Sequence, residues 1–339
     1  MPKVFVVLST YNGVPYVQPL LESIRRQSYG DWSLLVRDDG SSDETVLWLE
    51  EAAAEDSRIR LVEGGDRLGP AGSFGLLTQL AYDQGADCLF YADQDDLWHG
   101  DKIERMLSCM RRAEAAKPNS PQLVYSDLTV VNGHLQMVHP SFLRHSRLRH
   151  GEGRPLRIVL GRSFVLGCAA AANRELLELA LPMPETIASH DWWLALCAAA
   201  AGQISFLAES TLLYRRHGGN TSGPAGFWKG LNPFHCDWRR RWRIGLRSFE
   251  QSLAQARSLR ERLCERQPAD AREALALLDR FCAILDQPTS GLGRVMALHR
   301  LGVPSLDLPR RILYDVCMLR ASRTLRRPTK PQPAVQSRS

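Results

Sequence analysis

The sequence contains no long apolar run, no paired-cysteine motif and no glycine-rich dinucleotide fingerprint. None of the apolar stretches in its 339 residues approaches the roughly 18 residues that a membrane-spanning helix needs. The apolar start, Val4–Leu8, is too short for a signal peptide and is followed by no small-residue cleavage site. With 44% hydrophobic and 24% charged residues the composition is that of a globular protein, which we predict to stay in the cytoplasm.

The eight cysteines are scattered along the chain without a C-x-x-C pair, and several of them fall in apolar stretches. This distribution predicts small buried side chains and disfavours a disulfide framework or a zinc site. The absence of G-x-G-x-x-G disfavours a dinucleotide-binding protein, and the absence of a 20–50-residue repeat disfavours a solenoid. The length allows two domains, or one large domain with a tail.

Charge is unevenly distributed between the two parts of the chain. From Ala225 onward there are 22 Lys and Arg against 10 Asp and Glu, a net charge of +12, whereas residues 1–224 carry a net charge of −6. An acidic first part and a basic second part indicate two different tasks.

Short apolar runs alternate with helical patterns through the first half of the chain. Four such strand–helix alternations predict βαβ units and a mostly parallel sheet. The predicted strands are residues 3–8, 32–36, 59–62, 88–91, 122–125, 163–170, 204–207 and 211–215. The predicted helices begin near residues 17 and 44 and then cover 73–82, 102–116, 174–180 and 191–201.

Three carboxylates follow directly after one of these apolar runs. Asp93, Asp95 and Asp96 come after Cys88–Tyr91, so we expect them at the carboxyl end of a buried strand, where an open α/β sheet has its ligand crevice. Carboxylates clustered in this way suit a hard divalent cation such as Mg²⁺ or Mn²⁺. The alternative is an acidic turn that caps the next helix.

Five segments, in order, resemble motifs of the family 2 glycosyltransferases: Ser9–Gly13, Asp38–Asp43, Asp93–Asp96, His190–Trp193 and Tyr214–His217. The runs Ala-Asp-Gln-Asp-Asp-Leu-Trp and His-Asp-Trp-Trp are most similar to those of bacterial rhamnosyltransferases. The resemblance implies inverting transfer from a nucleoside diphosphate sugar.

The implied fold is α/β of the GT-A type, a nucleotide-sugar-binding domain with a mostly parallel central sheet. We expect this catalytic domain at residues 1–223, a basic amphipathic helical region at 224–325, and a disordered tail at 326–339. The glycine-rich stretch that begins at Gly218 is the predicted boundary.

The resemblance also implies a set of donor-binding residues. Asp38, at a strand end, would accept the N3–H of a pyrimidine, whereas Asp39 is also explained as a turn former beside a glycine. Arginine suits phosphate because its planar fork donates two parallel hydrogen bonds. The full set is Thr10, Tyr11, Asn12, Asp38, Asp39, Asp93, Arg215 and Arg216.

The implied metal ligands are Asp93, Asp95 and His217, holding Mg²⁺ or Mn²⁺ on the diphosphate. A cation there neutralises the departing nucleotide. Asp96 is either a third ligand or the acid at the start of the next helix, and the helix dipole favours the second interpretation.

Asp191 matches the catalytic base of the family. An inverting transfer needs a carboxylate that takes the proton of the acceptor hydroxyl, and the alternative is an ordinary helix N-terminal acid. His190 would orient Asp191 or cap the same helix. Trp192 and Trp193 would line a sugar or acceptor site, although two helix tryptophans also suit a core.

Where related sequences often carry Asn, this chain has Ser73 and Phe74, which leaves open whether the predicted helix 73–82 donates a hydrogen bond to the donor.

The predicted function is metal-dependent transfer of L-rhamnose from dTDP-L-rhamnose to lipopolysaccharide core or a lipid-linked glycan. The alternatives are another donor such as a UDP-hexose, a nucleotidyltransferase that makes nucleotide sugars, and a non-catalytic carbohydrate-binding protein.

The Arg- and Trp-rich stretch Trp238–Arg243 suits peripheral contact with an anionic membrane at its cytoplasmic face. A helical subdomain packed on the core is the alternative, and nucleic acid is not an expected partner.

Overall fold

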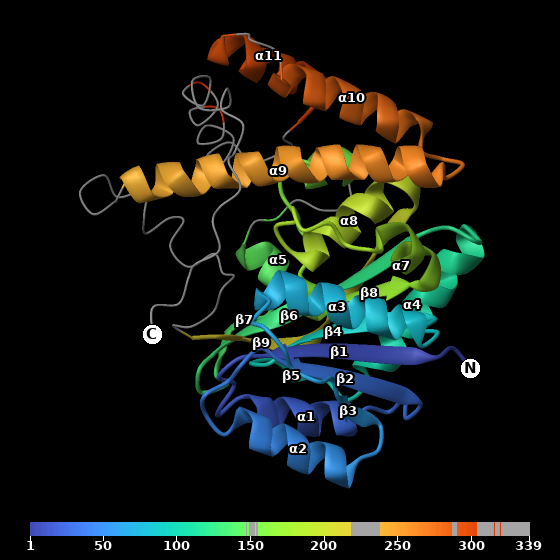
Figure 1. Cartoon of the computed structure of the whole chain (residues 1–339), viewed down its shortest axis with the longest axis vertical. Helices are drawn as coiled ribbons and strands as arrows, with labels where there is room; N and C mark the ends of the chain where they lie inside the picture. The colour runs from blue at the N-terminus through green and yellow to red at the C-terminus, as the bar shows by residue number, and fades with distance from the viewer. Residues whose placement is uncertain are drawn as a thin grey trace.

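A central β-sheet organises the chain (Figure 1). The computed structural model describes residues 1–146, 148, 153, 155–217, 238–286, 290–303, 315 and 319, without the side chains of 238–249. The nine strands are β1 (Val4–Thr10), β2 (Trp32–Asp38), β3 (Ile59–Leu61), β4 (Cys88–Asp93), β5 (Leu97–Trp98), β6 (Gln122–Asn132), β7 (Met137–His139), β8 (Ala170–Asn173) and β9 (Gln203–Arg216).

The helices cover the sheet and continue beyond it. Figure 1 shows α1 and α2 on one side and α8 on the other, with α9, α10 and α11 stacked outside α8. The helices are α1 (Val17–Arg25), α2 (Thr45–Glu55), α3 (Gly69–Asp83), α4 (Lys102–Ala116), α5 (Phe142–His145), α6 (Pro155–Val159), α7 (Arg174–Ala180), α8 (His190–Ala201), α9 (Trp238–Arg266), α10 (Arg272–Asp286) and α11 (Gly291–Leu301).

The sheet has the order β3-β2-β1-β4-β8-β6-β9-β5, with β7 paired to β6. The strands β3, β2, β1 and β4 are parallel, and β8 joins them antiparallel to β4. Five consecutive residues of β4, Cys88–Ala92, are buried, as expected for a strand covered by helices on both faces. The predicted α/β fold with a mostly parallel sheet is confirmed.

Strand register places the predicted polar residues at one edge of the sheet. Thr10 at the end of β1 pairs with Asp38 at the end of β2, and Ser9 pairs with Asp93 at the end of β4. Because these three strands are parallel, their carboxyl ends open onto the same crevice.

The prediction of a strand at residues 163–170 is wrong. Residues 167–169 form a 3₁₀ turn, and the strand is Ala170–Asn173, whose small side chains carry little strand propensity. The predicted strands 204–207 and 211–215 are one strand, β9, whose register against β6 shifts between Ser126 and Thr129.

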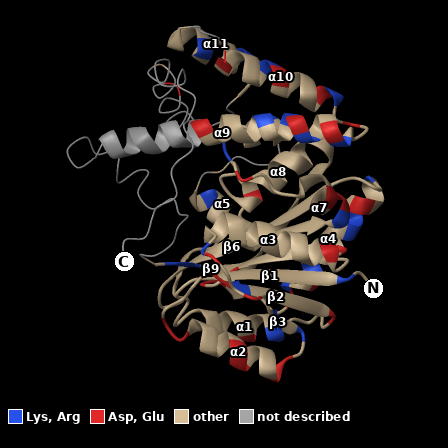
Figure 2. Ribbon diagram, viewed as in Figure 1, with Lys and Arg blue, Asp and Glu red and all other residues tan. Residues whose placement is uncertain are grey.

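The C-terminal helices pack onto the α/β part of the chain, and the buried residues Leu253, Ala256, Leu259 and Leu263 form an apolar stripe on α9. Lys, Arg, Asp and Glu are mixed along the described part of α9 and along α10 (Figure 2). Ion pairs Arg257–Asp286 and Arg260–Asp279 join the two helices. Over the described ranges, no helix combines the length and hydrophobicity required to cross a bilayer.

The predicted end of the first domain at residue 223 and the predicted tail 326–339 both lie outside the described residues.

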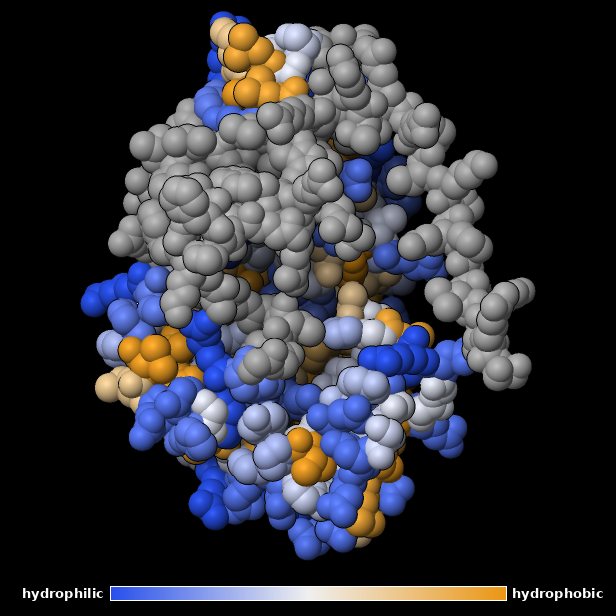
Figure 3. Space-filling view, turned by 90° about the vertical axis from the view of Figure 1, so that its left-hand side faces the viewer, coloured by the Kyte–Doolittle hydropathy of each residue, from blue (hydrophilic) through white to orange (hydrophobic). Residues whose placement is uncertain are grey.

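On α11, Leu292 and Met296 are 60% and 48% exposed. Figure 3 shows hydrophobic surface at the top of the molecule, the end at which α11 lies.

Gly202, between α8 and β9, is a packing constraint on the sheet. A Cβ atom there would lie 1.8 Å from the carbonyl oxygen of Pro121, at the start of β6. We expect Gly202→Ala to lower the free energy of unfolding by about 1–3 kcal/mol, measured by chemical denaturation. Gly30→Ala is the control, because a Cβ atom at Gly30 meets nothing within 4 Å. Equal stability of the two variants would contradict this packing account.

Candidate functional site

A cleft of about 300 Å³ opens at the carboxyl ends of β1 and β4. It collects residues from loops that are far apart in the sequence, including six of the predicted site residues. The lining is Ser9, Thr10, Tyr11, Asp39, Arg67, Gly69, Pro70, Phe74, Asp93, Gln94, Asp95, Tyr214 and His217.

The loop after β1 is held by hydrogen bonds to the loops that follow β4 and β2. Gln94 accepts a hydrogen bond from the N–H of Tyr11 at 2.9 Å and donates to its carbonyl at 3.1 Å. Asn12, with φ +48°, accepts from the N–H of Ser42 at 2.8 Å, and its own N–H donates to Ser41 Oγ at 2.8 Å. Of the predicted loop residues, Thr10 and Tyr11 therefore face the cleft, whereas Asn12 ties two loops together.

Both carboxylate oxygens of Asp38 accept hydrogen bonds, from its own loop and from Thr10 at the end of β1. Oδ1 accepts from the N–H groups of Gly40 and Ser41, and Oδ2 accepts from the hydroxyls of Thr10 and Ser41, at 2.6–3.0 Å. Asp38 is not among the cleft-lining residues. Because both of its oxygens already accept hydrogen bonds, the predicted bond from a pyrimidine N3–H would have to reach an oxygen that these donors also use.

Asp39 is buried, 4% exposed, and orders the loop before α3. It accepts hydrogen bonds from Arg37 at 2.5 Å and from the N–H groups of Leu68 and Gly69 at 2.8 Å. Burial alone would raise the pKa of Asp39, but these bonds and one from Ser73 hold it below its ordinary value. Ser73 thus contributes to this network, since its hydroxyl donates to Asp39 and accepts from Arg37.

Arg67 supplies a cation at the mouth of the cleft. Its guanidinium lies 3.8 Å from the centre of the Tyr11 ring and 3.9 Å from Asp39, while the side chain stays 62% exposed. A guanidinium stacked on an aromatic ring can still donate hydrogen bonds through its edge, so Arg67 is suited to a base or a phosphate in the cleft.

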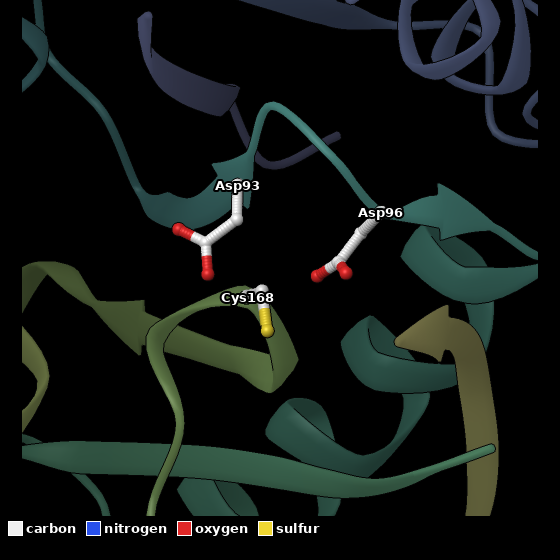
Figure 4. Close-up of side chains that lie close together, drawn as sticks. All are labelled: Asp93, Asp96 and Cys168. Carbon is white, nitrogen blue, oxygen red and sulfur yellow. The ribbon is translucent and has the colours of Figure 1, made fainter. Parts of the chain in front are cut away.

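Asp93 and Asp96 point toward one another and toward Cys168 (Figure 4). A carboxylate oxygen of each aspartate and the sulfur all lie within 4.8 Å of one another. Burial, then the charges of Asp95 and Asp191, raise the pKa of Asp93 to about 7. Burial and the charges of Asp93 and Asp95 raise the pKa of Asp96 well above its ordinary range, and its Oδ2 atom has no hydrogen-bond partner among the residues that the structure describes. A divalent cation fits this excess of buried negative charge.

Asp95 and His217 are in contact, as expected for residues predicted to share a metal. His217 Nε2 lies 2.8 Å from Asp95 Oδ2, and the imidazole stacks on Tyr16 with ring centres 4.7 Å apart. Arg215 is buried and holds the turn Asp93–Asp96 in place. Its side-chain Nε donates to the carbonyl of Asp95, and its backbone N–H donates to Oδ1 of Asp96. Arg215 therefore positions the acidic turn, and neither Arg215 nor the half-buried Arg216 lines the cleft.

Lys102, at the start of α4, is a fully buried cation beside this cluster. Its ammonium donates to the carbonyl of Cys168 and lies 4.3 Å from the centre of the Trp98 ring. Burial lowers the pKa of Lys102 to about 8, although the neighbouring Asp96 and Asp93 act in the opposite direction. Lys102 therefore offsets part of the negative charge and fixes the turn at 167–169.

The same turn supports Asp191. The N–H of Gly167 donates to Asp191 Oδ2 at 3.1 Å, while Ser189 and the N–H of Trp192 donate to Oδ1. The Asp191 charge contributes to the raised pKa of Asp93, so the predicted base and the predicted metal ligand belong to one electrostatic site.

The structure corrects the predicted sugar contact of Trp193. This side chain has no exposed surface and its indole N–H donates to the carbonyl of Ala180, so Trp193 is a core residue. Trp192 is 9% exposed and donates to the carbonyl of Val159. His190 is buried against Phe74 and Tyr91, and burial lowers its pKa.

Several residues that shape the site were not among the predicted site residues. Arg37 directly precedes Asp38, and Lys102 follows the motif Asp93–Asp96 by a few positions. A charged residue this close to an acidic motif is the signal that the sequence offers for both. Gln94 lies inside the acidic motif Asp93–Asp96 and is marked by its position in the same way, whereas Arg67 and Cys168 lie in loops or turns and carry no such signal.

Comparison with known proteins agrees with this geometry. The family model described as glycosyl transferase family 2 matches residues 5–178, just over half of the chain. The chain is 30% identical over 166 residues to the UDP-Glc:alpha-D-GlcNAc-diphosphoundecaprenol beta-1,3-glucosyltransferase WfgD of Escherichia coli, covering 48% of this chain and 61% of the relative. It is 25% identical over 226 residues to the dTDP-rhamnosyl transferase RfbG of Shigella flexneri, covering 64% and 73%.

Solved structures support the same fold. The mannosyltransferase PcManGT from Pyrobaculum calidifontis, in complex with GDP-Man and Mn²⁺, superposes with a TM-score of 0.51 at 18% identity, covering 95% of this chain and 82% of that one. At this identity the likeness concerns the fold alone. Because the family model covers more than half of the sequence, the chain belongs to glycosyl transferase family 2.

Proposed function

We propose that the protein transfers a sugar from a nucleoside diphosphate sugar to a glycan hydroxyl, with inversion, in a reaction that depends on Mg²⁺ or Mn²⁺. The observation that carries this proposal is the location of Asp93 and Asp95 in the wall of the 300 Å³ cleft, with Asp191 close enough to affect Asp93. Membership of the family supports the same reaction class.

In this proposal Asp93, Asp95 and His217 hold the cation. The buried negative charge and the contact between Asp95 and His217 fit such an ion. The cation would neutralise the diphosphate leaving group. Arg67 and Tyr11 are placed to contact the nucleotide at the mouth of the cleft, because both line it and stack on one another.

Asp191 acts as the base. The acceptor oxygen forms a bond to the anomeric carbon as the bond to the diphosphate breaks, and the carboxylate takes the hydroxyl proton. Three donors, including Gly167 and Ser189, fix the carboxylate. A Cβ atom on Gly167 would lie 2.4 Å from His190 Nε2, so the close approach of this turn to α8 requires glycine.

The proposed donor is dTDP-L-rhamnose, and the proposed acceptor is a bacterial surface glycan such as lipopolysaccharide core or a lipid-linked oligosaccharide. Similarity to the dTDP-rhamnosyl transferase RfbG supports this donor. Similarity to WfgD, whose name specifies UDP-Glc and a diphosphoundecaprenol acceptor, supports a lipid-linked acceptor and makes UDP-glucose the second candidate donor.

We expect the purified protein to release nucleoside diphosphate slowly from one sugar donor, with Mg²⁺ or Mn²⁺ present, in a panel that includes dTDP-L-rhamnose and UDP-glucose. Asp95→Asn should abolish the metal-dependent release of nucleoside diphosphate, because it removes a proposed ligand of the cation. Asp191→Asn should lower the rate about 100- to 10,000-fold, because general base catalysis contributes that much, while donor affinity measured by calorimetry is retained.

The control variant is Asp101→Asn, an exposed acid at the start of α4, which should keep full activity. Turnover of UDP-glucose alone would replace the rhamnose assignment and leave the mechanism unchanged. The transferase proposal is contradicted if no nucleotide sugar in the panel is bound or turned over.

Peripheral membrane contact through the C-terminal helices is also proposed. The exposed Leu292 and Met296 lie one turn apart on α11, as suits insertion into a lipid interface. Co-sedimentation with phosphatidylglycerol vesicles should weaken in the double variant Leu292→Ser, Met296→Ser. Unchanged or absent sedimentation of both proteins would rule out this contact.

A further inference from the structure

Helix α9 lies against the segment that leads into the proposed base. Arg262, only 8% exposed, donates from Nη1 to the carbonyls of Leu179 and Leu181 at 2.9 and 2.6 Å. It also donates from Nη2 to the carbonyl of Pro182 at 2.6 Å. Three carbonyls at the end of α7 thus share one guanidinium, a cluster that matches its fixed fork of N–H donors.

A second group of contacts lies at the other end of the same segment. Gln255 is fully buried, and its Oε1 atom accepts from the N–H of Ala188 at 3.4 Å. Ser258 lies 3.0 Å from Thr186, hydroxyl to hydroxyl. Residues 255, 258 and 262 follow the spacing of one helix face, so a single face of α9 holds residues 181–188 at both ends.

The segment fixed in this way ends at Ser189, which donates to the Asp191 carboxylate. Displacement of residues 181–188 would therefore move Ser189 and the first turn of α8. A shift of about 1 Å in a catalytic group is enough to slow a reaction about 100-fold, so a contact remote from the cleft can affect the rate.

We propose that helix α9 is a positioning element of the active centre and that Arg262 positions Asp191 through residues 181–189. This inference rests on the proposed function in so far as Asp191 is the base. Helix α9 follows the family-matched residues 5–178 and becomes part of the catalytic unit, whether or not the helices also contact a membrane.

The test combines hydrogen–deuterium exchange with turnover, using Arg262→Ala and Arg262→Lys. Arg262→Ala should raise exchange in residues 181–191 at least about tenfold and lower kcat for donor hydrolysis about 10- to 100-fold. The donor Kd should stay within about twofold, because none of the described side chains of α9, residues 250–266, lines the cleft. Arg262→Lys keeps one donor group and should give an intermediate kcat.

Arg260→Ala is the matched control, since Arg260 lies on the same helix, is about half exposed, and pairs with Asp279 on α10. It should leave exchange and kcat unchanged. If Arg262→Ala does not fold, Gln255→Met removes the bond to Ala188 with a side chain of similar size and should give the same pattern.

Unchanged exchange in residues 181–191, or raised exchange with an unchanged kcat, would overturn the proposal. Equal loss of donor binding and kcat would do so as well, because that pattern indicates general destabilisation. If the wild-type protein neither binds nor turns over any donor, the proposed function fails, and the exchange experiment still reports whether α9 holds the segment.

Discussion

The structure depends on how negative charge is accommodated at the end of β4. Asp96 is buried and Asp93 is half-buried in the cleft wall, their carboxylates lie within 4.8 Å of one another, and Asp95 is beside them. Like charges in a poorly solvated site repel strongly unless a proton or a cation compensates them. Lys102 provides part of the compensation from the protein side, and a divalent cation with a bound diphosphate would provide the rest. The surrounding loops are built to hold this arrangement.

Fixed hydrogen bonds connect these loops into one unit. Gln94 ties the acidic turn to the loop after β1, Arg215 holds the turn from β9, and Lys102 anchors the 167–169 turn that contacts Asp191. Helix α9 extends the same scaffold from the other side through Arg262. A site held by buried polar contacts loses little entropy when a ligand binds, which favours precise placement of reacting groups.

Sequence patterns predicted the parallel strands because apolar runs such as Cys88–Tyr91 are distinctive, and the resemblance pointed to Asp93, Asp95 and His217 at one edge. Strand β8 was missed because Ala170–Asn173 is short and has no β-branched residue. The role of Trp193 was left open between a sugar site and the core, because an aromatic residue beside a catalytic motif suits either, and only three-dimensional packing decides between them. Arg262 was beyond reach for the same reason, since its acceptors come from a distant segment.

The most direct test of the central claim is the thermal stability of the protein at pH 5 and pH 7.5, with and without Mn²⁺ and UDP or dTDP. Without cation, folded Asp93 keeps its proton to about pH 7, whereas the unfolded chain loses it near pH 4, so this group's contribution to stability falls as pH rises between those values. The cation should therefore raise Tm more at pH 7.5 than at pH 5, and less in Asp93→Asn. Equal Tm shifts at both pH values, or a shift unaffected by Asp93→Asn, would contradict the account.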